Sequence, residues 1–132
     1  MPDVNWLAVL LCGVSSLLLG GLWYSPMLFA RPWQEAAGLS EEKMKSGNMA
    51  MIFGLTFVLS LIAATVFAMF LGRNFGLVPA IAAGFSAGLC WVAASYGISY
   101  LFEHRPLKLW LINGGYHTLQ FTLFGLILGA MR

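Results

Sequence analysis

Charge is scarce in this 132-residue sequence, which has seven Lys and Arg and five Asp and Glu, 9% of the chain, against 60% hydrophobic residues. A soluble domain carries about 25% charged residues, so twelve charges are too few to give a globule of this size a polar surface. The net charge of +2 and the lack of a basic stripe argue against nucleic acid as a partner. The composition predicts an integral membrane protein.

Patterns that bind metals or haem are also missing. The two cysteines, Cys12 and Cys90, fall in the middle of separate apolar segments, which favours small buried hydrophobes over a disulfide. His104 and His117 are thirteen residues apart, about 20 Å along a helix, so only two copies of His117 in a dimer could clamp an iron. No nucleophile–base pair is visible either. We therefore expect no cofactor, no metal and no enzymatic activity.

The few charges are clustered, and the four long segments between the clusters contain none. A helix needs roughly 20 apolar residues to cross a hydrocarbon core about 30 Å thick, and each segment is long enough. We expect an all-α integral membrane protein with four transmembrane helices in an up-down-up-down bundle, forming a single domain over residues 1–132. The predicted spans are residues 4–24, 49–71, 78–100 and 109–130.

The first connection, residues 30–48, is predicted to carry short helices of its own. Pro32 suits the first position of a helix and Gly38 suits its end, which predicts a short interfacial helix over residues 32–37. Ser40 is a suitable N-cap for a second one, because two glutamates follow it directly.

The distribution of Lys and Arg predicts an orientation. Connections 30–48 and 103–108 lie on the same side of the expected bundle and hold five of these residues, whereas the other side holds only Arg73 and Arg132. Because cytoplasmic loops are enriched in Lys and Arg, we expect both connections in the cytoplasm and both termini outside.

Several short motifs connect the sequence with a known family. Residues 20–26 are Gly-Gly-Leu-Trp-Tyr-Ser-Pro, with Phe29 and Trp33 following, and residues 105–107 and 111–117 are Arg-Pro-Leu and Leu-Ile-Asn-Gly-Gly-Tyr-His. With these motifs the chain resembles, over nearly its whole length, the bacterial membrane family called domain of unknown function 1761. The resemblance implies a four-span protein of the bacterial cytoplasmic (inner) membrane, and it implies no activity.

No Asp, Glu, Lys or Arg lies within a predicted span, which argues against a proton-driven exporter of the small four-helix type, since such exporters rely on an intramembrane carboxylate. His117 is the one side chain at depth that titrates near neutral pH. Asn113 and Gln120 lie four residues before it and three after it, so the three form a polar stripe on one helix face. Other side chains are expected at a similar level or at the same end: Tyr96, Ser99, Trp23 and Tyr24.

Two interpretations of the polar stripe remain open. As interhelical glue, each polar group would bond to a neighbouring helix, at about 0.6 kcal/mol per bond. As a vestibule open to the cytoplasm, the stripe would bind a lipid or another small ligand. The sequence thus predicts a small non-catalytic membrane protein, with a transporter or channel subunit as one alternative and a structural or accessory protein as another.

Glycines recur on three of the predicted spans at spacings that let helix backbones approach closely. Because four short spans bury little surface, we expect a homo-oligomer, either a dimer or a trimer. Membrane lipids are the other expected partners. The glycines assigned to helix packing are Gly20, Gly21, Gly84, Gly88, Gly114 and Gly115.

Overall fold

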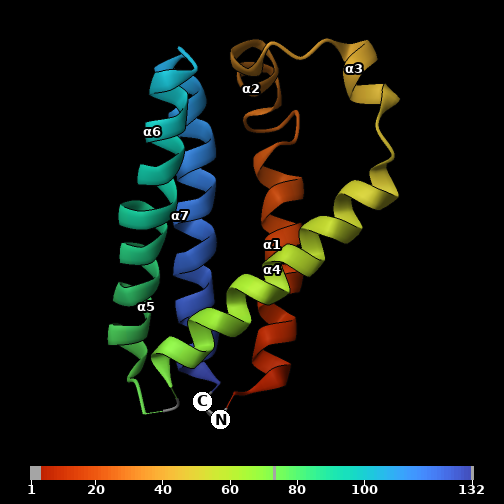
Figure 1. The fold of residues 1–132 in the computed structure, drawn as a ribbon. Helices are drawn as coiled ribbons and strands as arrows, with labels where there is room; N and C mark the ends of the chain where they lie inside the picture. Colours follow the sequence, from red (N-terminus) through yellow and green to blue (C-terminus); the bar gives the residue numbers. More distant parts are fainter. Residues whose placement is uncertain (1–3, 73, 132) are drawn as a thin grey trace.

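The computed structural model describes residues 4–72 and 74–131, and within them every regular element is a helix (Figure 1). In chain order the helices are α1 (Trp6–Trp23), α2 (Ala30–Ala37), α3 (Glu41–Ser46), α4 (Met49–Leu71), α5 (Leu77–Ser86), the π-helix η1 (Ala87–Ala93), α6 (Ala94–Phe102) and α7 (Leu107–Ala130). The predicted all-α class is confirmed.

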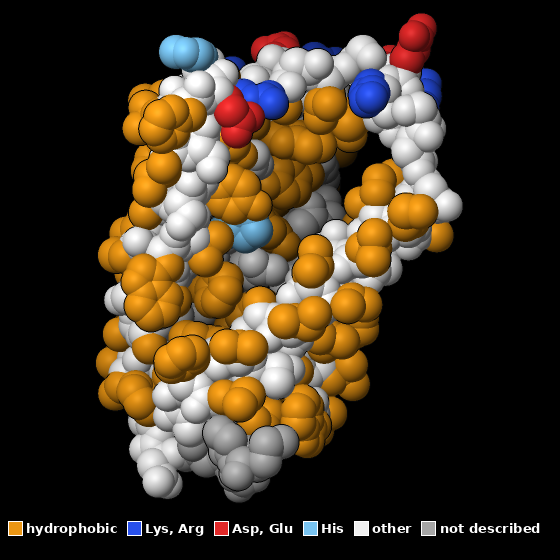
Figure 2. Space-filling view, viewed as in Figure 1, with side chains coloured by type: hydrophobic (Ala, Val, Ile, Leu, Met, Phe, Trp, Pro, Cys, Tyr) orange, Lys and Arg blue, Asp and Glu red, His pale blue; other side chains and the backbone are white. Residues whose placement is uncertain are grey.

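The long helices run between two ends of the molecule. Both termini lie at one end, and α2, α3 and the turn between α6 and α7 lie at the other (Figure 1). At the terminal end the side-chain amide of Asn5 donates to the backbone oxygen of Met131. Lys, Arg, Asp and Glu gather at the opposite end (Figure 2). Arg73 and Arg132, which entered the predicted orientation, lie outside the described residues.

Three helical rods are long and apolar enough to cross a membrane: Trp6–Trp23, Met49–Leu71 and Leu77–Phe102. The last combines α5, η1 and α6 into one rod of 26 residues. This finding supports the prediction of a membrane protein. α7 is similar in length, with 24 residues, but the polar side chains of its first half make it less apolar than the three rods.

The helices begin and end within two residues of the predicted spans. The short helix predicted for residues 32–37 begins two residues earlier, at Ala30, so Pro32 lies inside its first turn and does not start it. Gly38 ends this helix with a φ of +72°, a left-handed conformation that glycine adopts without strain. The Ser40 hydroxyl accepts a hydrogen bond from the Lys43 backbone N–H at 3.1 Å and so caps α3.

α4 does not run alongside the other helices as in a regular bundle. It crosses them diagonally (Figure 1), and its C-terminal half buries Ala64, Phe67 and Leu71 in the core shared with α1 and α7. Its N-terminal half has exposed apolar side chains, among them Met51 and Leu55. In a space-filling view a hollow separates this half of α4 from α6 and α7 (Figure 2).

The rod α5–η1–α6 packs against α7 at very short range. A Cβ added to Gly84 would collide with the backbone oxygen of Phe121, and one added to Gly125 would collide with the backbone oxygen of Ala80. A Cβ at Gly88 would lie 2.7 Å from the Thr118 Cα. Only glycine at these positions allows the two backbones to come so close.

The π-helix η1 continues this small-residue face toward α6. The residues that face α7 along the rod are Ala80, Gly84, Gly88, Ala93 and Gly97. Their steps are four, four, five and four residues, and the step of five falls within η1, where the wider π-helical turn accommodates the extra residue. The indole N–H of Trp110, on α7, donates to the Ala93 backbone oxygen at 2.8 Å, so this interhelical bond lies where the register changes.

Candidate functional site

Hydrogen bonds join α7 to α1 through Gln120, which is 6% exposed. Its side-chain nitrogen Nε2 donates to the Ser16 hydroxyl at 2.6 Å and to the Tyr116 hydroxyl at 3.4 Å. The Tyr116 hydroxyl donates to the Ser16 backbone oxygen at 3.0 Å. The Ser16 hydroxyl donates to the Cys12 backbone oxygen at 3.3 Å. Within the described residues, no buried side-chain nitrogen or oxygen lacks a partner.

Two backbone carbonyls of α1 accept the hydroxyl protons of this network. A carbonyl oxygen can only accept, so the Tyr116 and Ser16 hydroxyls use their protons on backbone oxygens and both accept from Gln120. The amide nitrogen of Gln120 therefore points to α1, and its oxygen Oε1 points to His117 Nδ1, 3.2 Å away. In the tautomer that this arrangement favours, Nδ1 carries the imidazole proton and Nε2 keeps a lone pair.

His117 also stacks on Tyr96 of α6. The ring centroids are 4.9 Å apart and the planes are inclined by only 17°. Tyr116 packs edge-on against the imidazole, with ring centroids also 4.9 Å apart. Within the described residues, neither His117 Nε2 nor the Tyr96 hydroxyl makes a hydrogen bond, and neither atom is fully buried. We call these two side chains the open pair.

Both side chains of the open pair are partly exposed. Tyr96 lines an open groove of about 440 Å³ along η1 and α6, together with Trp91, Val92, Ser95 and Ser99. Figure 2 shows apolar side chains and a histidine in the hollow beside α4. The partial exposure of His117 agrees with that view.

A second polar cluster centres on Asn113, nearer the charged end of α7. Its side-chain oxygen accepts from the Tyr24 hydroxyl at 2.6 Å, and its side-chain nitrogen donates to the Tyr100 hydroxyl at 2.8 Å. Tyr24 in turn packs against Trp33 of α2, with ring centroids 4.9 Å apart. This cluster therefore joins α1, α2, α6 and α7 at one level.

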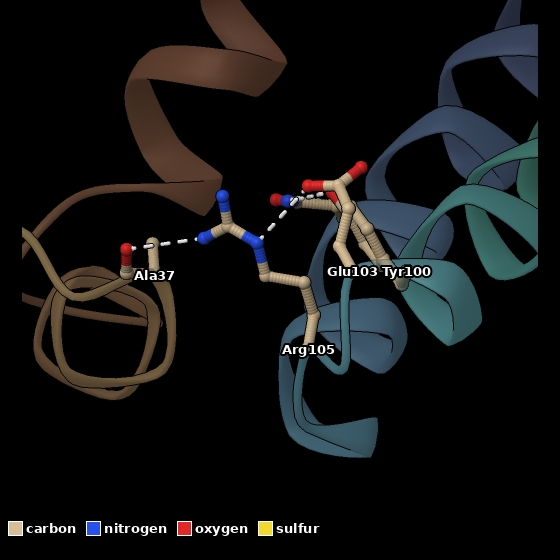
Figure 3. Close-up of polar contacts among 5 residues, drawn as sticks. Ala37, Tyr100, Glu103 and Arg105 are labelled. Carbon is tan, nitrogen blue, oxygen red and sulfur yellow. Dashed lines mark hydrogen bonds and ion pairs between the residues drawn. The ribbon is translucent and has the colours of Figure 1, made fainter.

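Above this cluster, Arg105 links the α6–α7 turn to α2. Figure 3 shows its guanidinium between the two segments: Nε pairs with the Glu103 carboxylate at 3.2 Å and Nη1 donates to the Ala37 backbone oxygen at 3.4 Å. Ala37 is the last residue of α2, where backbone oxygens lack partners inside the helix and attract positive charge.

The structure does not bring all the predicted site residues together. Five of them belong to the two polar clusters described above. The cluster at Gln120 contains Gln120, His117 and Tyr96, and the cluster at Asn113 contains Asn113 and Tyr24. Ser99 is exposed in the groove of about 440 Å³ that Tyr96 also lines. The indole N–H of Trp23 donates to the Ile112 backbone oxygen at 2.9 Å, and its ring lines a different, apolar groove of about 490 Å³ between η1 and α7.

The predicted packing glycines also divide. Gly84 and Gly88 lie against α7, Gly114 lies against Ala93 of η1, and a Cβ at Gly115 would approach the Trp23 ring to 3.1 Å. A Cβ at Gly20 would lie 3.5 Å from the Tyr116 hydroxyl, whereas one at Gly21 would meet nothing within 4 Å. Consecutive helix positions point about 100° apart, so Gly20 faces α7, whereas Gly21 points away from the other helices.

Sequence reasoning missed Ser16, Tyr100 and Tyr116 as members of the site. Tyr116 carried a usable signal, because it lies three residues after Asn113 and four before Gln120 and so shares their helix face. Cys90 also differs from its predicted burial: it is exposed, whereas Cys12 is buried.

An all-helical chain with three membrane-length rods, and with its polar side chains bonded between α1, α6 and α7, has the character of a small helical membrane protein. The chain belongs to the family described as protein of unknown function (DUF1761), whose model matches residues 7–129. No curated protein and no solved structure matches it. In the described ranges no group of three His, Cys, Asp or Glu could hold a metal ion.

Proposed function

We propose that this chain is a four-span membrane protein that binds a lipid or another small amphiphilic molecule at the open pair, Tyr96 and His117, and catalyses no reaction. One observation carries the proposal: the buried polar side chains around α7 are bonded to one another, yet these two side chains keep free polar atoms. In a hydrocarbon surrounding an unpaired polar group is unfavourable, so a ligand that supplies its partner is stabilising.

The fourth span in this proposal is α7. Its 24 residues cover about 36 Å, enough to cross a bilayer core, and it packs beside the rod α5–η1–α6 along its length (Figure 1). Its polar side chains do not oppose this placement, because Gln120 is buried, Asn113 bonds to Tyr24 and Tyr100, and the Nδ1 of His117 bonds to Gln120. On its polar side α7 faces α1, α6 and the hollow beside α4 (Figure 2).

The proposed location is a bacterial inner membrane, with α2, α3 and the α6–α7 turn in the cytoplasm and both termini outside. The gathering of Lys and Arg at that end of the molecule supports this orientation (Figure 2). Trp33 of α2 packs on Tyr24 at the end of α1. Trp and Tyr are enriched at membrane–water interfaces, so this contact supports placing the end of α1 at the interface.

A small transporter or channel subunit is the second candidate. The observation that favours it is the hollow beside α4 (Figure 2), because a helix attached mainly at one end can change its angle more easily than one packed along its length. A homo-oligomer fits either function, since the N-terminal half of α4 exposes apolar side chains to whatever surrounds the chain.

The test compares the small molecules that co-purify with the protein in mild detergent, measured by native mass spectrometry. We expect His117→Phe, which keeps a stacking ring but removes the free nitrogen, to lose most of a ligand bound to the wild type. Thr122→Val is the matched control on the same helix, because the Thr122 hydroxyl donates only to the Thr118 backbone oxygen, at 2.7 Å. If both variants retain the same molecules as the wild type and only the stability of His117→Phe falls, the network is structural glue.

A further inference from the structure

We infer that the ligand of the open pair presents an uncharged hydroxyl group, which donates a hydrogen bond to His117 Nε2. This inference rests on the proposed binding function and goes beyond it by naming the chemistry of the ligand's head. It follows from three properties of the site: the direction of its hydrogen bonds, the absence of a charged side chain on the described helices around it, and the residues that line the groove at Tyr96.

The hydrogen-bond direction makes Nε2 an acceptor. Both hydroxyls that Gln120 contacts have donated their protons to backbone oxygens of α1, so Gln120 must donate to them and present its oxygen to His117 Nδ1. A neutral imidazole has one N–H, and here Nδ1 holds it. The free nitrogen therefore selects a ligand that brings a donor, and it repels a bare carbonyl or ether oxygen.

The surroundings select a donor without charge. His117 lies ten residues into α7 and Tyr96 six residues before the end of α6, which places them roughly 15 Å and 9 Å along the helices from the charged end. Within the described parts of α1, η1 and α6 there is no Asp, Glu, Lys or Arg, and on α7 the only one is Lys108, near its start. A charged head at this depth would lack a counter-ion and would be costly to bury.

The groove fits an amphiphile. Tyr96, whose ring stacks on His117, lines the groove of about 440 Å³ together with Ser99. The hydroxyls of Tyr96 and Ser99 can donate to the oxygen of a ligand in this groove, and in the proposed complex the ligand's own proton goes to His117. The groove also contains Trp91 and Val92, whose apolar surfaces suit a hydrocarbon chain. The ligand class is thus a neutral lipid or other long-chain molecule with a free alcohol group.

Matched probes test this assignment: oleyl alcohol, oleyl methyl ether and oleylamine, offered in equal amounts to the detergent-solubilised protein and counted as bound species by native mass spectrometry. We expect oleyl alcohol to bind about three- to tenfold better than the ether, which corresponds to one net hydrogen bond. Oleylamine, which is protonated at neutral pH, should bind more weakly than the alcohol. The preference for alcohol over ether should vanish in His117→Phe and persist in Thr122→Val.

The outcomes separate this inference from the proposed function. Equal binding of alcohol and ether in the wild type, with both reduced in His117→Phe, would overturn the hydroxyl assignment while the site stands. Binding of all three probes that is the same in wild type and His117→Phe would overturn both. If His117→Phe fails to fold, nitrogen-15 NMR of histidine-labelled wild type decides: Nε2 should be unprotonated and should shift with the alcohol but not with the ether, and a protonated Nε2 refutes the inference.

Discussion

α4 and α7 are nearly equal in length, with 23 and 24 residues, yet they have opposite roles in the molecule. α4 is apolar on every side and buries five residues, whereas α7 carries the polar side chains and buries nine. In a soluble protein the more hydrophobic helix would be the more buried one. Here the order is inverted, as expected where lipid accepts apolar surface and polar groups must find partners inside the protein.

The same contrast separates two ways of holding a helix in place. α7 is fixed along its length by glycine contacts with α5, by indole bonds from Trp23 and Trp110, and by the Gln120 network. Between Met49 and Leu71, the described residues of α4 make one side-chain hydrogen bond. It goes from the Thr65 hydroxyl to the Leu61 backbone oxygen and therefore stays within α4. Substitutions matched between the two helices should therefore have very different effects.

The largest difference is expected for glycine substitutions. Gly125→Ala on α7 forces a Cβ against the backbone oxygen of Ala80, so α5 and α7 must separate, and we expect a loss of about 2–3 kcal/mol. Gly54→Ala on α4 meets nothing within 4 Å, and alanine's higher helix propensity should make it neutral or slightly stabilising. Thermal unfolding in detergent, followed by circular dichroism, checks both variants. Equal melting temperatures would refute the close α5–α7 contact.

A smaller difference is expected for polar side chains. Gln120→Leu removes the bond to the Ser16 hydroxyl of α1, the bond to the Tyr116 hydroxyl of α7 and the acceptor for His117 Nδ1, and we expect a loss of about 1–2 kcal/mol. Thr65→Val on α4 breaks only a bond within its own helix and should change stability by less than about 0.5 kcal/mol. The same unfolding assay measures both.

Gln120→Leu has a second consequence that a purely structural loss would not produce. Without the Gln120 oxygen, nothing holds the imidazole proton on Nδ1, and the proton should redistribute between the two nitrogens of His117. Histidine nitrogen-15 spectra of the variant report this directly. Unchanged spectra would mean that the network does not set the tautomer.

The sequence was informative about α7 and uninformative about α4 for a physical reason. Asn113, His117 and Gln120 recur at helical spacing, so their shared face could be predicted, and Tyr116 could have been included by the same arithmetic. α4 is apolar all round, so it has no polar face to set its rotation or its angle. Its diagonal path depends on packing that the pattern does not encode.

The packing of the rod α5–η1–α6 could be predicted only as far as its α-helical register holds. Ala80, Gly84 and Gly88 follow the four-residue spacing, but the step of five to Ala93 breaks it, and a search for regular spacing stops there. The bonds from Tyr24 and Trp23 to α7 join residues 89 positions apart. Side-chain pairs of that separation carry no local signal in a single sequence.

The smallest effect is expected at the charged end, where α2 is held by exposed contacts. Arg105→Ala removes the donor to the Ala37 backbone oxygen and the partner of Glu103 (Figure 3). Exposed ion pairs contribute about 0–1 kcal/mol, so global unfolding should hardly change. The local effect should be visible, because α2 then keeps the Trp33–Tyr24 ring contact as its main side-chain anchor. The backbone amides of α2 should exchange hydrogen several-fold faster, while those of α7 do not.

The control is Lys108→Ala, which should leave α2 unchanged. Lys108 is an exposed neighbour that makes no hydrogen bond or ion pair within the described residues. If α2 exchange is the same in both variants, the aromatic contact alone holds α2 on the bundle, and this end of the molecule is fastened by ring packing just as α7 is fastened by glycine contacts and hydrogen bonds.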